Sequence, residues 1–147
     1  MKVVQSYKTA MSRKGASAPL RFLFSKNMIS GTVLDYGCGK GSDARYLKNS
    51  GFDTKGYDPY WNPIDIGDQK FDTILCTYVF NVLDHNKEDL LLSSIKNHLK
   101  DDGKAYITVR RDLKKDGYTS RGFQRIVKLN LPIVKENSGF CIYGLSV

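Results

Sequence analysis

Short apolar runs alternate with amphipathic stretches along this chain of 147 residues, and the alternation predicts an α/β fold with a parallel sheet. The predicted strands cover 32–36, 53–58, 71–79 and 104–109. The run at 71–79 is nearly continuous in apolar residues, as expected for a central parallel strand that is buried on both faces. The predicted helices begin near residue 20 and cover 42–50 and 86–99.

Two links along the chain depart from a simple alternation of strands and helices. Only twelve residues separate Asp58 from Phe71, which is too few for a full crossover helix and a further strand. We therefore expect this link to be reduced or irregular. Residues 101–103 are expected to form a turn. The last segment, 139–147, alternates loosely and is expected to form a strand that pairs with 133–135.

A glycine-rich turn follows the first predicted strand. Gly37 and Gly39 allow the backbone to turn tightly and to approach a ligand without an intervening Cβ. The helix that follows offers free N–H groups at its start. Asp58 ends the second strand, twenty-one residues after Gly37, where nucleoside-binding α/β folds place an acid that accepts hydrogen bonds from ribose. The alternative is an ordinary tight turn, with Asp58 in solvent.

The glycine spacing distinguishes between two cofactor classes. The dinucleotide fingerprint is G-x-G-x-x-G, whereas Gly37, Gly39 and Gly41 form G-x-G-x-G. With Asp35 two residues before the first glycine, this segment resembles motif I of the class I methyltransferases that depend on S-adenosylmethionine (SAM). The resemblance implies a Rossmann-like three-layer sandwich, with a mostly parallel sheet, a C-terminal antiparallel hairpin and a reduced third-strand region. It also implies SAM as the cofactor.

The same resemblance assigns site residues. The glycine loop would wrap the methionine end of SAM, and the acid after strand two would hold the ribose. The residues that would bind the cofactor are Asp35, Gly37, Gly39, Gly41, Asp58, Pro59, Tyr60, Asp65, Thr77 and Tyr78. Asn81 and Tyr78 are the candidate catalytic residues, because the family handles its acceptor after the strand that corresponds to 71–79 here. Neither the Asp/Asn/Ser-Pro-Pro-aromatic tetrad of DNA amino-methyltransferases nor a Pro-Cys nucleophile is found there, and Cys76 is most simply a core residue.

Composition indicates an ordinary globular domain. Hydrophobic residues make up 41% of the chain and charged residues 26%, as in soluble proteins that form one core, so residues 1–147 are expected to form a single domain. No apolar run is long enough to span a membrane, and no signal peptide is recognisable. Three isolated cysteines predict neither a disulfide framework nor a metal site, and favour a reducing cytoplasm.

The net charge of +8 is unevenly distributed. Residues 1–30 carry +6, residues 31–103 carry −4 and residues 104–128 carry +6. This asymmetry suggests a polyanionic partner, most simply nucleic acid, although a solvated basic surface is the alternative. The candidate phosphate contacts are Arg13, Lys14, Arg21, Arg110, Arg111 and Arg121. Tyr118 and Phe123 lie among those bases and are suited to stacking on an unpaired base.

Five segments resemble the methyltransferase-like proteins associated with DNA phosphorothioation systems: 8–13, 35–41, 56–60, 81–83 and 119–124. This resemblance names no substrate by itself. Together with the uneven charge it favours nucleic acid, DNA ahead of RNA, as the acceptor class, with the basic segment 1–30 covering the site and a partner protein as a candidate for target recognition. Two other functions remain open from the sequence. One is a small-molecule methyltransferase, and the other is a SAM-binding subunit or sensor without transferase activity.

Overall fold

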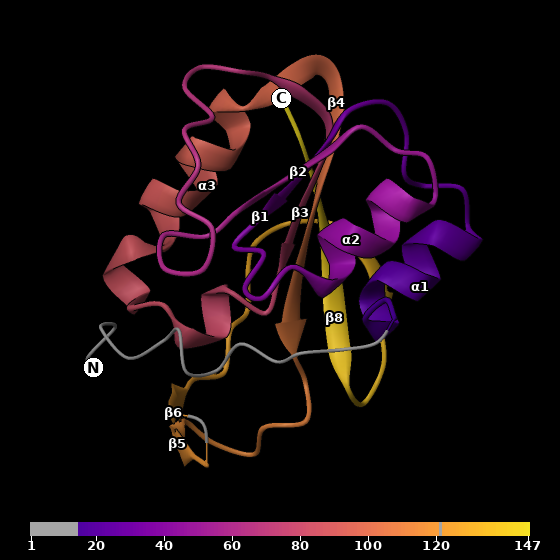
Figure 1. Cartoon of the computed structure of the whole chain (residues 1–147). Helices are drawn as coiled ribbons and strands as arrows, with labels where there is room; N and C mark the ends of the chain where they lie inside the picture. The colour runs from indigo at the N-terminus through magenta and orange to yellow at the C-terminus, as the bar shows by residue number, and fades with distance from the viewer. Residues whose placement is uncertain (1–14, 121) are drawn as a thin grey trace.

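The computed structural model describes residues 15–120 and 122–147. Six strands form one sheet in the order β2-β1-β3-β4-β8-β7 (Figure 1). These strands are β1 (Val33–Tyr36), β2 (Thr54–Tyr57), β3 (Phe71–Thr77), β4 (Leu99–Arg110), β7 (Ile133–Glu136) and β8 (Phe140–Ser146). The first four are parallel, while β8 runs antiparallel to both β4 and β7. The predicted mostly parallel sheet and its C-terminal antiparallel hairpin are confirmed.

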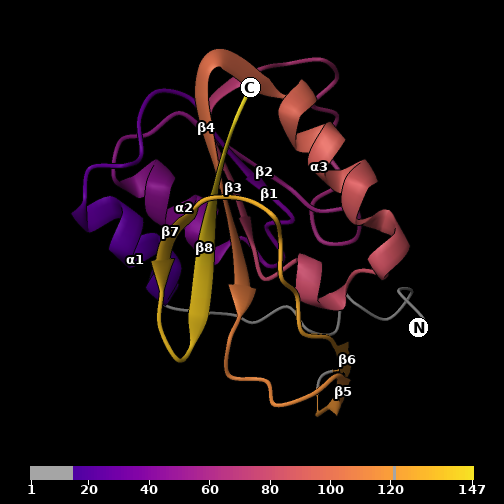
Figure 2. The same ribbon diagram turned by 180° about the vertical axis from the view of Figure 1, so that it is seen from behind.

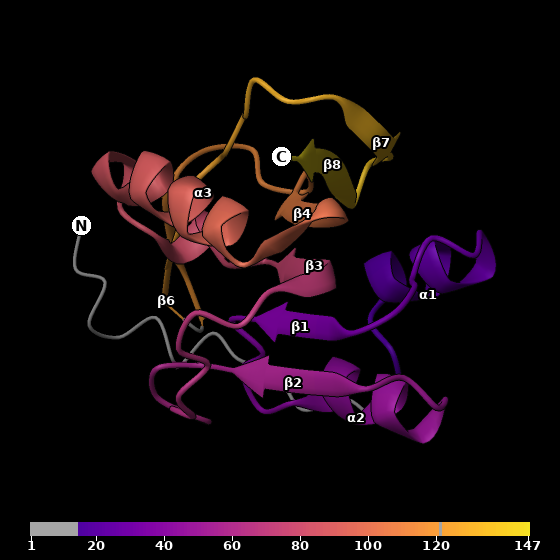
Figure 3. The ribbon, with the colours of Figure 1, turned by 90° about the horizontal axis from the view of Figure 1, so that it is seen from above.

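Helices cover both faces of the sheet, which makes three layers (Figure 3). On one face lie α1 (Ala18–Ser25) and α2 (Ser42–Asn49). On the other face lies α3 (Glu88–Asn97), which follows the short 3₁₀ turns η2 (Phe80–Val82) and η3 (His85–Lys87). Because successive strand side chains point to opposite faces, Val33 packs in the cluster with Leu20 of α1, and Leu34 packs in the cluster with Ile95 of α3.

The link between β2 and β3 is more reduced than expected. Residues 58–70 contribute no strand, so β2 lies at the edge of the sheet. The chain folds back at once through two backbone hydrogen bonds between Asp58 and Asn62. The side-chain amide of Asn62 then donates to the carbonyl of Gly56. One consequence is an open region beside β2 and α2.

Two features were not predicted from the pattern. The expected turn at 101–103 lies within the span of β4, where the pairing with β3 shifts from Phe71–Leu99 to Thr73–Lys104. Between β4 and β7, the strands β5 (Gly117–Thr119) and β6 (Gly122–Gln124) form a separate hairpin below the end of β4 (Figure 2). No helix of the described residues is long and apolar enough to cross a membrane.

Candidate cofactor site and an adjoining basic groove

The glycine loop, residues 37–41, leaves β1 and enters α2. Gly37, Gly39 and Gly41 have φ angles of +85°, +55° and +85°, a left-handed region that side chains disfavour. The amides of Gly37 and Cys38 both donate to the carbonyl of Tyr57, at 2.7 and 2.9 Å. A Cβ atom on Gly37 would lie 2.4 Å from Cγ2 of Val79. The loop backbone is thus held closely between the end of β2 and the segment after β3.

Asp58 fastens this loop. Its Oδ2 accepts a hydrogen bond from the Gly39 amide at 3.0 Å, and its Oδ1 accepts from the amides of Tyr60 and Trp61, each at 2.9 Å. An ionised carboxylate offers about four lone-pair sites, so these three hydrogen bonds leave about one site for a ligand. The predicted acid therefore lies beside the glycine loop, and it also shapes that loop.

Three carboxylates, Asp35, Asp43 and Asp58, form what we call the acidic cluster. Asp35 is buried at the end of β1, and no described residue donates a hydrogen bond to its carboxyl group. Burial, followed by the charges of Asp43 and Asp58, raises the pKa of Asp35 well above its ordinary value. Asp43, on α2, is bound at 2.7 Å by both the amide and the hydroxyl of Ser17. Such a cluster complements a positively charged ligand.

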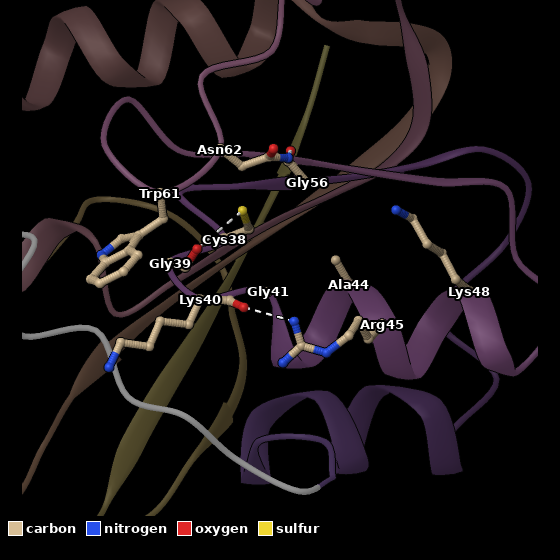
Figure 4. Close-up of a pocket in the computed structure, with 10 residues that line it drawn as sticks. All are labelled: Cys38, Gly39, Lys40, Gly41, Ala44, Arg45, Lys48, Gly56, Trp61 and Asn62. Atoms are coloured by element: carbon tan, nitrogen blue, oxygen red, sulfur yellow. Dashed lines mark hydrogen bonds between the residues drawn. The ribbon is translucent and has the colours of Figure 1, made fainter.

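A groove with a volume of about 290 Å³ adjoins the glycine loop (Figure 4). We call it the basic groove, and it is lined by Cys38, Gly39, Lys40, Gly41, Ala44, Arg45, Lys48, Gly56, Trp61 and Asn62. None of the three acidic-cluster residues lines it. Burial, with smaller contributions from the charges of Asp35 and Asp58, raises the pKa of the Cys38 thiol to about 12. The thiol is therefore neutral near pH 7, and the three cationic side chains set the charge of the groove.

Comparison with known families identifies the chain. Residues 7–132 match a protein family described as a methyltransferase domain. The chain belongs to this methyltransferase domain family. The predicted SAM-dependent methyltransferase class is thereby confirmed, whereas the finer resemblance to DNA phosphorothioation proteins is not shown. No curated protein matches the chain.

Solved structures share the fold of this methyltransferase domain at low sequence identity. A SAM-dependent methyltransferase from Bacteroides fragilis, in complex with S-adenosylhomocysteine, is 18% identical with a TM-score of 0.65, over 100% of this chain and 82% of that one. The 1,6-didemethyltoxoflavin-N1-methyltransferase of Burkholderia thailandensis, also with S-adenosylhomocysteine, is 16% identical with a TM-score of 0.62, over 84% and 74% of the two chains.

A third similar structure is that of a protein described in connection with the conversion of a disulfide bond into a thioacetal group during echinomycin biosynthesis. It is 20% identical with a TM-score of 0.59, over 67% of this chain and 52% of that one. This methyltransferase domain therefore spans about half of that protein's length. The Rossmann-like fold is confirmed by these structures, and the predicted cofactor class agrees with the S-adenosylhomocysteine held by two of them.

Tyr78 follows directly after β3 in this methyltransferase domain, with a φ of +60° that is unusual for a residue with a bulky side chain. Its amide donates to the carbonyl of Thr108 at 2.9 Å. Such a conformation costs on the order of 1–3 kcal/mol and is often found at functional sites. Thr77, the last residue of β3, is half-buried beside it.

Asn81 requires a correction, because it is completely buried. Its Oδ1 accepts from the Arg110 amide and its Nδ2 donates to the Arg125 carbonyl, each at 2.8 Å. This side chain ties β4 to the start of the chain after β6, and it presents no surface to an acceptor. Its position after the strand at 71–79 had suggested a catalytic role, but the sequence does not reveal that the Asn81 side chain is buried.

Three predicted residues lie in the loop after Asp58. Pro59 and Tyr60 are exposed, and the Tyr60 ring packs edge-on against Trp61 with centroids 5.0 Å apart. Asp65 is also exposed, and its Oδ1 accepts from the Gly67 amide at 2.8 Å. The sequence pattern alone did not indicate Trp61, Asp43 or the bases of the basic groove as site residues. Asp43 lies in the first turn of α2. An acid at this position more commonly stabilises the helix than binds a ligand, so the sequence offered little reason to choose it.

The arginines of the predicted basic surface that the structure describes have internal partners. Arg110 makes a bidentate pair with Asp112 at 2.8 and 2.7 Å. The Arg111 guanidinium donates to Glu136 and to the Val127 carbonyl at 2.7 Å, and to the Tyr143 hydroxyl at 2.6 Å. This is a correction for Arg111, whose side chain joins three parts of the fold.

Among the other predicted arginines, Arg21 donates to the Ala16 carbonyl at 2.7 Å. Arg13, Lys14 and Arg121 lie outside the described residues. The described residues contain no group of three side chains suited to holding a metal ion.

Proposed function

We propose that this chain binds SAM at the glycine loop and the acidic cluster, and transfers its methyl group to an acceptor. The observation that carries the proposal is the hydrogen bond from the Gly39 amide to Asp58, which joins the loop to the acid at the ends of β1 and β2. When bound, SAM supplies a sulfonium methyl group that a nucleophile takes in line, releasing S-adenosylhomocysteine, while any displaced acceptor proton passes to water.

The described residues fit this cofactor. SAM carries an ammonium and a sulfonium charge, and the acidic cluster places three carboxylates beside the loop. Gly37 and Gly39 let the backbone approach the methionine end, and the remaining lone-pair site of Asp58 suits a ribose hydroxyl. Pro59 and Tyr60 would line the adenine. Asp65 would lie near the edge of the adenine ring.

The acceptor end of the site is assigned to Tyr78, with Thr77 beside it. The left-handed backbone at Tyr78 turns the chain sharply at the carboxyl end of β3, where open α/β sheets bind their ligands. We assign Tyr78 a direct contact with the acceptor. A Tyr78→Gly variant would relieve the backbone strain, so increased stability together with lost transfer would support this role.

The N-terminal segment is proposed to complete the site. Ser17 binds Asp43 of the acidic cluster through two hydrogen bonds, and α1 follows on the same face of the sheet as α2. Ser17, which precedes α1, thus lies beside the cofactor site. This arrangement supports a covering role for residues 1–30 within a single domain.

A small molecule is the acceptor that we favour. The pairs Arg110–Asp112 and Arg111–Glu136 remove two of the six expected phosphate contacts. Among similar structures, the Burkholderia thailandensis enzyme holds 1,6-didemethyltoxoflavin. DNA or RNA is the second candidate, favoured by the net charge of +8 and by Tyr118, which is 79% exposed and packs edge-on against Phe123.

The test combines calorimetric titration with SAM and transfer from SAM labelled on its methyl group. Metabolite, DNA, RNA and protein fractions would each be incubated with the protein. We expect SAM binding and label in the metabolite fraction, whereas label in DNA or RNA would establish the second candidate. Binding without label in any fraction would indicate a SAM-binding subunit that needs a partner. No SAM binding would overturn the proposal.

A further inference from the structure

The basic groove differs in charge from the proposed SAM site. Its described lining includes Lys40, Arg45 and Lys48 but no carboxylate. The ammonium and sulfonium of SAM would both be repelled by three positive side chains, whereas an anion would be attracted. The groove is therefore a separate surface, which shares the glycine loop with the cofactor site and adjoins Asp58 through the amide of Trp61.

The short link after β2 leaves this groove open. No helix is formed between β2 and β3, so the side of α2 next to β2 lacks a covering element there. The floor is closely packed, because a Cβ atom on Gly56 would lie 3.1 Å from Cys38 Sγ and 3.2 Å from Ala44 Cβ. Trp61 and Asn62 of the link form the opposite wall (Figure 4).

The three cations of the groove are not held in ion pairs with any described residue. Arg45 donates to the Lys40 carbonyl at 2.8 Å and more weakly to Ser42 at 3.5 Å, which leaves most of its N–H donors unused. Lys48 extends from α2 toward the strand that carries Gly56 (Figure 4). Its positive charge also acts on Cys38 in the groove wall.

An aromatic surface accompanies these cations. Trp61 is 40% exposed, and Lys40 Nζ lies 5.1 Å from the centre of its ring. An indole ring beside an ammonium group, in a groove that a guanidinium also lines, is suited to a ligand that carries both a planar ring and an anionic group. The volume of about 290 Å³ is near the lower end for ligand sites, about 300 Å³, so such a ligand must be small or contribute only one unit.

We propose that the basic groove binds a nucleotide unit, with its phosphate at Arg45 and Lys48 and its base against Trp61. The unit is either a free nucleotide or one residue of a single-stranded nucleic acid. This proposal does not rest on the proposed methyl transfer, because none of the three residues belongs to the cofactor site.

Trp61 provides a direct measurement, since it is the only tryptophan of the chain. The full chain, saturated with S-adenosylhomocysteine, would be titrated with AMP, inorganic phosphate and single-stranded oligonucleotide while Trp61 fluorescence is recorded. We expect AMP to change the fluorescence in a saturable manner, and phosphate to compete with it. A response to the oligonucleotide but not to AMP would identify the nucleic-acid source. No response to any of the three would overturn the proposal.

Lys48→Glu and Lys96→Glu form a matched pair of variants. Both lysines lie in the last turn of an exposed helix, but Lys96 belongs to α3 on the other face of the sheet. Loss of one charged phosphate contact is expected to weaken AMP binding about tenfold in Lys48→Glu, with little change in Lys96→Glu. Equal weakening in both would indicate only a net-charge effect and would overturn the assigned site. Calorimetric SAM titration of the same variants tests the cofactor site separately.

Discussion

The acidic cluster and the basic groove adjoin the same glycine loop but have opposite charge and opposite burial. Asp35 is 3% exposed and Asp43 is 8% exposed, whereas Arg45 and Lys48 are exposed. Exposed cations remain solvated, so the groove carries its charge at little cost to the fold. Buried carboxylates lose hydration and must find hydrogen bonds or become protonated. The acidic cluster therefore costs the folded state more free energy than the basic groove does.

Within the acidic cluster, most of this cost comes from Asp35. Asp43 and Asp58 accept hydrogen bonds from backbone amides or from Ser17, whereas no described residue donates to Asp35. A cationic ligand would supply the interaction that Asp35 lacks. We therefore regard Asp35 as the point where fold stability and cofactor affinity oppose each other.

The largest expected effect comes from Gly37→Ala, which tests whether the shared loop supports both surfaces. The alanine would have to keep the φ of +85° that Gly37 has, and its Cβ would lie 2.4 Å from Val79 Cγ2. We expect the free energy of unfolding to fall by about 3 kcal/mol, with loss of both SAM binding and the Trp61 response. Chemical denaturation, calorimetric SAM titration and Trp61 fluorescence would measure these effects.

Gly51→Ala is the control, because Gly51 has a φ of +96° but no atom lies within 4 Å of the position that its Cβ would take. It isolates the backbone contribution, about 1–2 kcal/mol. If the two variants were equally stable, the contact with Val79 would not restrain the loop.

The next effect is expected from Asp58→Ala, which removes the acid that fastens the loop. The proposed ribose contact and the hydrogen bond from the Gly39 amide would be lost together. SAM affinity is expected to fall about 100-fold, or about 2.7 kcal/mol. Calorimetric titration measures it, and Asp53→Ala, at the exposed opposite end of the same strand, is the control. Unchanged affinity in Asp58→Ala would remove Asp58 from the proposed site.

The parts of the molecule that the sequence predicted well are those encoded locally. The strand before Gly37, the glycine turn and the strand that leads to Asp58 each have a pattern that is read within a few residues. The shortness of the 59–70 link also predicted a reduced region, and the structure shows no strand there. Buried strands and a glycine turn depend on nearby residues, so one sequence is sufficient to find them.

The parts that the sequence did not predict depend on contacts between distant segments. Asn81 had the position of an acceptor residue, but its amide is held by Arg110 and Arg125, far along the chain. Arg111 had the composition of a phosphate ligand, but Glu136 and Tyr143 occupy it. The basic groove likewise combines α2 with the link after β2. No local pattern indicates which of these charged groups acquire partners.

The smallest effect, and the one that separates the two surfaces most clearly, is expected from Asp35→Asn. The pKa of Asp35 is raised above its ordinary value of 3.8. The neutral form of Asp35 therefore contributes fully to the free energy of unfolding below pH 3.8. This contribution is lost as the pH rises toward the raised pKa of the folded state. Asn mimics the neutral acid at every pH. The variant should match the wild type in acid and become more stable by about 1 kcal/mol near pH 7, or roughly 3 °C in Tm.

The same substitution at Asp43 should have the opposite sign. Asp43→Asn weakens two hydrogen bonds from Ser17, so it is expected to lower the Tm near pH 7. Both variants should bind SAM more weakly, while the Trp61 response of the basic groove stays unchanged, because neither residue lines it. Thermal unfolding across the acid range and calorimetry with SAM would measure the contrast. If Asp35→Asn were stabilised yet bound SAM as tightly as the wild type, the unmet hydrogen-bonding need of Asp35 would not serve the cofactor. The inference that fold stability and SAM affinity oppose each other at Asp35 would then be wrong.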